Sequence, residues 1–163
     1  MNRQQILLAL ALAEAGIPVR VGQFEERLLL QKAVYLLQEA GVHLGYRYRW
    51  YLRGPYSTDL ASDVFFLASQ GASVEQELAS WQLDSESKAH IGRLKTLFSG
   101  QALGELVKRL ELLASVLYLV RTHQVRAGAP RRISEILKAN NKPFGQGDVL
   151  GALRQLRGYG FAC

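Results

Sequence analysis

The spacing of apolar residues predicts a chain built mainly of helices. Residues 3–15 are almost entirely apolar after Gln5 and are rich in alanine and leucine, which are strong helix formers. Between residues 23 and 40, apolar side chains recur every three or four positions, which indicates one buried helix face. The same spacing over 102–123 predicts a long helix that is apolar enough to lie at the centre of the core.

The period changes at residues 46–52, where aromatic and basic residues alternate. This alternation predicts a half-buried strand with one apolar, aromatic face (Tyr46, Tyr48, Trp50, Leu52) and one basic face (Arg47, Arg49, Tyr51, Arg53). A lone strand is not stable, so it needs a partner. Residues 19–21 and 77–83 are the candidates, and we prefer 77–83 because it also alternates.

Residues 53–57 (RGPYS) predict a turn out of this strand, with Ser57 capping the next helix through its hydroxyl group. That helix is expected to bury Leu60, Val64 and Leu67 together with Phe65 or Phe66. A polar helix is expected over 85–98.

The tail has a pattern of its own, after a loop at 125–130 that is the expected internal boundary. Two short helices joined by a turn at 140–143 resemble a helix-turn-helix. The prediction is a mainly α, compact helical domain with a small two- or three-stranded sheet and a C-terminal helix pair. We expect a single domain over 1–163, with a core at 1–124 and a helix-turn-helix-like subregion at 131–163.

Composition excludes several classes of site and leaves the partner open. The single cysteine, Cys163, excludes an internal disulfide and a thiolate cluster and fits a reducing, cytoplasmic compartment. The three histidines are not at metal-ligand spacing, so we expect neither a metal nor a cofactor. No apolar run reaches the roughly 20 residues of a membrane span, and residues 6–13 are better explained as a buried helix than as a signal sequence. The net charge of +6 suits nucleic acid, an anionic membrane surface or an acidic protein.

The basic strand is the first candidate binding site. Arginine side chains bind phosphate or carboxylate groups, and aromatic rings stack on bases. The alternation, however, sends Arg47, Arg49 and Arg53 to the face opposite most of the aromatic residues. A partner-binding role is therefore favoured over base stacking, and a purely structural alternative pairs these arginines with acids such as Asp59. Asp59 and Asp63 share a helix face, where capping and ion pairing are favoured over cation binding or acid–base chemistry.

The tail is the second candidate, as a surface for DNA or RNA. The residues that would contact nucleic acid are Arg131, Arg132, Lys142, Gln146, Arg154 and Arg157. In a DNA-binding helix-turn-helix, the N-terminal residues of the second helix contact the bases. Here the positive charge lies at the C-terminal end, where the helix dipole also favours it. A nucleic-acid-binding subunit is the alternative function.

Signatures of catalysis are missing, and the central stretch resembles a known family. There is no G-x-S-x-G, no phosphate-binding glycine loop and no H-E-x-x-H. The sequences KAVYLLQ at 32–38, GYRYRWYL at 45–52 and RGPYSTDL at 53–60, in this order, resemble the Panacea domain. The matching residues are Lys32, Tyr35, Leu36, Gly54, Pro55 and Tyr56. The resemblance covers about residues 28–67, and the tail from Arg131 lies outside it.

The family includes SocA-type antitoxins and many uncharacterised prokaryotic proteins. The resemblance implies a helical domain with a small sheet and no enzymatic activity. Family members neutralise a toxin, or act as adaptors that present a toxin to a protease, usually in toxin–antitoxin or phage-defence systems. The expected function is therefore a protein-binding module whose partner is a toxin or another defence-system subunit. The expected contact residues are Arg47, Arg49, Arg53, Tyr56 and Asp59. The sequence names neither the partner nor the oligomeric state.

Overall fold

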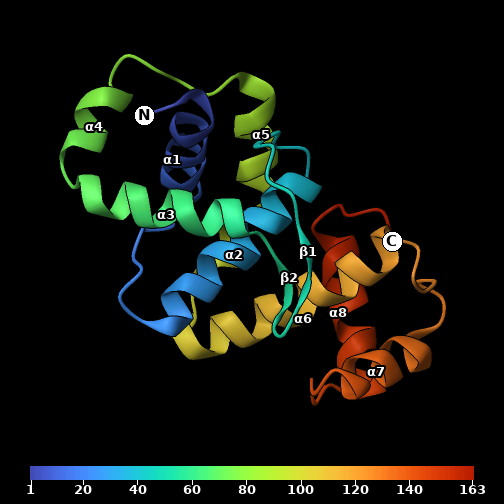
Figure 1. Ribbon diagram of the computed structural model, residues 1–163. Coiled ribbons are helices and arrows are strands. Elements are labelled where there is room, and N and C mark those ends of the chain that lie inside the picture. The colour runs from blue at the N-terminus through green and yellow to red at the C-terminus, as the bar shows by residue number, and fades with distance from the viewer.

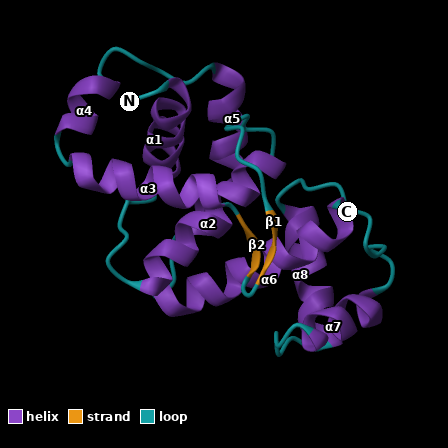
Figure 2. Cartoon of the chain, in the orientation of Figure 1, coloured by secondary structure: helices purple, strands orange, loops and turns teal.

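The structure is a computed structural model that describes residues 1–163. It is mainly α, as the periodicity predicted, with one small antiparallel sheet of two strands (Figure 2). In chain order the elements are α1 (Arg3–Ala15), α2 (Phe24–Glu39), β1 (Arg49–Tyr51), β2 (Gly54–Tyr56), α3 (Thr58–Gln70), α4 (Ser73–Leu78), α5 (Ser85–Leu94), the 3-10 helix η1 (Lys95–Phe98), α6 (Leu103–Arg121), α7 (Pro130–Ala139) and α8 (Gln146–Gly158).

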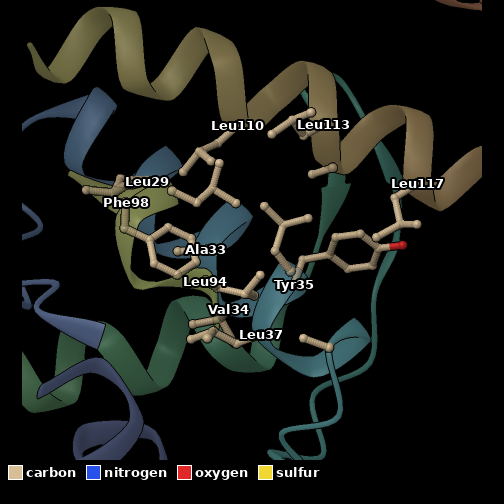
Figure 3. Close-up of a cluster of buried hydrophobic side chains, with 14 of the residues drawn as sticks. Leu29, Ala33, Val34, Tyr35, Leu37, Leu94, Phe98, Leu110, Leu113 and Leu117 are labelled. Carbon is tan, nitrogen blue, oxygen red and sulfur yellow. The ribbon is translucent and has the colours of Figure 1, made fainter. Parts of the chain in front are cut away.

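Helices α2 and α6 pack against each other and form the centre of the core. Figure 3 shows Leu29 and Ala33 of α2 in the same cluster as Leu110, Leu113 and Leu117 of α6. One continuous cluster of 42 buried hydrophobic residues extends from α1 to the segment after α8, so the tail helices share the core of the rest.

The other helices lie on two sides of this central pair. Helix α1 contacts α3, α4 and α5, whereas α8 packs on α6 and carries α7. Figure 1 shows α7 and α8 at the end of the molecule opposite α1 and α4, with the β1–β2 hairpin between the two groups. None of the helices combines the length and apolar character that crossing a membrane requires.

Local sequence explains where the helices begin and end. Asn2 and Gln5 form a reciprocal capping box at the start of α1, and Gly16 ends that helix in the left-handed conformation. The predicted range of 3–15 is therefore confirmed. Ser57 caps α3 as predicted, because its Oγ accepts a hydrogen bond from the Leu60 backbone N–H at 3.2 Å. The two predicted tail helices are also present, and α7 begins with Pro130 at its first turn.

The predicted strand partner was wrong. Strand β1 pairs with β2, in a register that places Arg49 opposite Tyr56 and Tyr51 opposite Gly54. The expected partner, 77–83, forms no strand, and its first two residues belong to α4. A pairing closed by two residues costs less chain entropy than one across more than twenty residues, which favours the hairpin.

The turn also lies earlier than predicted, so Leu52 differs from the other members of the aromatic face. Leu52 and Arg53 connect the strands, whereas Gly54 and Pro55 belong to β2. Leu52 is at the tip and is 76% exposed, although the alternation predicted it to be buried.

Two further expectations about helices need correction. Phe65 and Phe66 are both exposed, because Leu60, Val64 and Leu67 already fill the buried face of α3 at helical spacing. The expected helix over 85–98 divides at residue 95 into α5 and the tighter turn η1.

Candidate functional site

The hairpin is attached to α2 by polar contacts of its buried residues. The Gln31 side chain donates to the Ser57 carbonyl oxygen at 2.8 Å and accepts from the Ser57 N–H at 2.9 Å. The next residue, Lys32, donates from Nζ to the Pro55 carbonyl oxygen at 2.9 Å. These contacts satisfy backbone groups within β2 and directly after it, and they fix its position relative to α2.

Gly54 allows β2 to approach α6 closely. Its φ of +92° is in the region that favours glycine, and a β-carbon at this position would overlap Ser115 Oγ. Ser115 Oγ is itself buried and has no hydrogen-bond partner. The glycine therefore sets the distance between the hairpin and the central helix.

A buried ion pair joins the tip of the hairpin to α6 and to the α7–α8 link. Lys142 Nζ lies 3.3 Å from Glu111 Oε1 and donates to the Leu52 carbonyl oxygen at 2.6 Å. The same ammonium group is 5.5 Å from the centre of the Trp50 ring. Arg53 Nη1 is 3.9 Å from the other carboxylate oxygen of Glu111. Three elements distant in sequence therefore meet at one carboxylate.

Positive charge exceeds negative charge at this junction. Burial lowers the pKa of Lys32 to about 7; the Glu111 carboxylate opposes this effect, while the charges of Lys142 and Arg53 add to it. Burial also lowers the pKa of Lys142, again opposed by Glu111. A single buried carboxylate thus faces three cationic side chains. Titratable groups perturbed in this way are concentrated at functional sites in proteins.

Two hollows share Phe24 in their linings, and the larger of the two also includes Arg53, Glu111 and Lys142 of the junction. The larger, of about 550 Å³, lies between the start of α2, the hairpin tip, the start of α6 and the α7–α8 link. It is lined by Phe24, Glu25, Leu28, Leu52, Arg53, Gly104, Val107, Lys108, Glu111 and Asn140 to Phe144. The smaller, of about 210 Å³, lies between α2, β2 and α3 and is lined by Phe24, Arg27, Leu28, Gln31, Tyr56, Ala61, Val64 and Phe65.

Exposed apolar side chains gather around these hollows. Phe24, Tyr51 and Phe65 are each about half exposed, at 47%, 56% and 50%, and Leu52 is the most exposed of the large apolar residues. The Tyr51 and Tyr56 rings pack at a centre-to-centre distance of 5.4 Å. Arg27 and Arg53 place their guanidinium carbons 5.9 and 5.7 Å from the centre of the Phe24 ring. We call this surface the hairpin face: Phe24, Arg27, Tyr51, Leu52, Arg53, Tyr56 and Phe65.

The structure separates the residues predicted to bind a partner. Arg53 and Tyr56 belong to the hairpin face, and Arg49 is the cross-strand neighbour of Tyr56. Arg47 and Asp59 are exposed but line neither hollow.

Asp63 has a structural role between helices. It accepts a hydrogen bond from the Tyr46 hydroxyl group at 2.7 Å and another from the Gln5 side chain at 2.9 Å. The carboxylate of Asp59, four residues earlier, lies outside this network and is exposed to solvent. The two acids that share a helix face therefore do not act as a pair.

The tail residues predicted to bind nucleic acid are also dispersed. Arg131 and Arg132 both pair with Glu135, and Arg157 donates to the Cys163 carbonyl oxygen. Gln146 and Arg154 are exposed. Lys142 differs from the predicted surface position, because its ammonium group is buried against Glu111.

Sequence reasoning missed the central residues of the hairpin face. Phe24 begins α2 in register with buried Leu28, so its spacing gave no signal that it is exposed. Leu52 was expected to be buried, as was one of Phe65 and Phe66, yet all three are exposed. No group of three or more histidine, cysteine, aspartate or glutamate side chains is placed to hold a metal ion.

The chain matches no protein-family model, no curated protein and no solved structure. The resemblance of residues 28–67 to the Panacea domain therefore stays a prediction.

Proposed function

We propose that this chain is a non-enzymatic protein-binding module that contacts its partner through the hairpin face. The observation that carries the proposal is the cluster of exposed apolar side chains around Phe24, which lines both hollows. A contiguous apolar surface of this kind is unfavourable in water and is typical of a surface that another molecule covers.

The composition of the hairpin face is that of an interface. Aromatic and arginine side chains are enriched at the centres of protein interfaces, where a few anchors supply most of the binding energy. Phe24 is the natural anchor, because it borders both hollows and its ring lies near the guanidinium groups of Arg27 and Arg53. The net charge of +6 favours an acidic partner and a fast, electrostatically steered encounter.

The order of the three central motifs supports a more specific role. They resemble the Panacea domain, and two of the matching residues, Lys32 and Gly54, fix the position of the hairpin. An antitoxin-like or adaptor protein of a cytoplasmic toxin–antitoxin or phage-defence system is the role that follows. The tail gives less support to nucleic-acid binding, because several of its cations are buried or paired within the protein.

The test compares two variants of equal side-chain exposure. Phe24→Asp changes the hairpin face, whereas Trp81→Asp, at 48% exposure against 47%, changes a surface outside it. Proteins captured from the native host by the tagged chain, in the presence of nuclease and high salt, are identified and the stoichiometric one is purified.

Binding of that protein is then measured by calorimetry, and its effect on growth is measured with and without the chain. We expect Phe24→Asp to abolish both binding and any relief of toxicity, and Trp81→Asp to leave both intact. Equal binding by the two variants would refute the hairpin face as the docking surface.

A further inference from the structure

Cationic side chains outnumber carboxylates in the lining of the larger hollow. Its charged lining consists of three cations, Arg53, Lys108 and Lys142, and two carboxylates, Glu25 and Glu111. Lys32 lies behind it, where its charge interacts with those of Glu111, Lys142 and Arg53. Arg53 and Lys108 are exposed, so a ligand in the hollow can reach both of their charges.

We propose that the larger hollow receives an aspartate or glutamate side chain of the partner protein, paired with Arg53 and Lys108, while a neighbouring apolar residue of the partner covers Phe24 and Leu52. This inference rests on the proposed function and adds the chemistry that the partner must present. It assigns the charged part of the recognition to the larger hollow and the apolar part to its rim.

A carboxylate fits this lining better than a phosphate does. Cations exceed carboxylates by one in the lining itself, without Lys32 behind it, and this excess matches the single charge of a carboxylate. A dianionic phosphate would be repelled by Glu25 and Glu111, which line the same space. The apolar part of the lining, which includes Leu28, Val107 and Phe144, suits the methylene groups of a peptide side chain.

Burial of a partner carboxylate would also be coupled to protonation of Lys32. The groups that face Lys32 are Glu111 and Ser115 of α6, Arg53 and the Pro55 carbonyl group of the hairpin, and Lys142 of the α7–α8 link. An added negative charge nearby favours the ammonium form and raises the pKa of Lys32 from about 7. Complex formation near pH 7.5 should therefore take up protons, and binding should tighten as pH falls from 9 to 7.

A displayed library of random 12-residue peptides, selected on the full chain, supplies the probe. The most enriched peptide is synthesised with its acidic residue and again with the matching amide, aspartate to asparagine or glutamate to glutamine. Both are titrated into the wild-type protein and into Arg53→Gln, Lys108→Gln and the control Arg3→Gln, whose arginine is exposed at the start of α1 and lines neither hollow.

We expect the enriched peptides to combine an acidic with an apolar residue. Loss of the carboxylate, or of Arg53 or Lys108, should weaken binding about tenfold or more, whereas Arg3→Gln should have little effect. Titrations in two buffers of different ionisation enthalpy should show proton uptake by the wild-type protein and clearly less by Lys32→Met.

Two results would contradict the inference in distinguishable ways. Peptides that depend on Phe24 but carry no acidic residue, and that bind Arg53→Gln as tightly as wild type, would overturn the carboxylate assignment and leave the hairpin face as the docking surface. Peptides whose binding is unaffected by Phe24→Asp would overturn both. Selection of phosphate-mimicking acidic runs that inorganic phosphate displaces would also refute the single carboxylate.

Discussion

Replacing Lys32 by methionine should make the protein more stable at neutral pH. Lys32 is 1% exposed, and burial lowers its pKa from an ordinary value of 10.5 to about 7. In the unfolded chain the amine keeps its proton up to about pH 10.5, whereas in the folded protein it loses the proton above about pH 7. Between these values the unfolded state holds more protons, so stability rises with pH.

The two pKa values give the size of the effect. They imply a destabilisation of about 4 kcal/mol at pH 7 that falls to about 2 kcal/mol at pH 9. Methionine has a similar length and no charge, but it leaves the Pro55 carbonyl oxygen without its donor, at a cost of about 1–2 kcal/mol. The variant should therefore be more stable by roughly 2–3 kcal/mol at pH 7 and nearly equal to the wild type at pH 9.

Urea denaturation followed by tryptophan fluorescence at pH 7, 8 and 9 measures these free energies of unfolding. Lys88→Met, at an exposed position of α5, is the control and should show no such pH-dependent difference from wild type. A Lys32→Met protein that is less stable than wild type at pH 7, or a difference that does not change with pH, would refute the reasoning. A lysine that lowers stability in this way is expected where binding, not folding, requires the charge.

The remaining predictions concern the same junction and the start of α3. Glu111→Gln should lower the free energy of unfolding by about 3 kcal/mol at pH 7, because it leaves Lys142 buried without its counter-charge. This loss of stability should shrink toward pH 9.5 as the buried lysines release their protons. A loss that stays constant with pH in urea titrations would contradict the prediction. Gly54→Ala should lower the free energy of unfolding by about 2 kcal/mol or more, through the positive φ at this position and the overlap with Ser115 Oγ. In a double-mutant cycle, Ser115→Ala should restore part of that stability, whereas strictly additive effects would argue against the overlap. Ser57→Ala should cost about 1–2 kcal/mol by removing the cap of α3, measured as a lower melting temperature, and an unchanged value would show that the cap is replaced.

Helices could be predicted from the sequence because their signals are local. The range of α1 follows from a capping residue, an apolar run and a terminating glycine within one stretch of chain. The same holds for the Ser57 cap and for the two tail helices. Alternation is likewise a property of adjacent residues, and the strand predicted over 46–52 is present, although β1 is shorter and spans only Arg49–Tyr51.

The strand partner and the exposure of aromatic residues depended on tertiary structure. Alternation at 77–83 resembled a strand, but a hairpin closed by two residues formed instead. Phe65 has a large apolar side chain, as core residues do, but it is exposed because α3 buries a different face. Of the residues that form the hairpin face, Arg53 and Tyr56 were named from the sequence as contact candidates, whereas Phe24 and Leu52 were not.

The sequence by itself therefore determined a mainly helical chain with a basic aromatic strand, because periodicity and capping act over a few residues. Only the tertiary structure decided that Lys32, Arg53 and Lys142 meet at one carboxylate, Glu111, next to two hollows. These residues are brought together by the packing of α2, the hairpin, α6 and the α7–α8 link. No local pattern encodes this arrangement, because each of these residues occupies a position in the sequence that is ordinary for a helix or a surface.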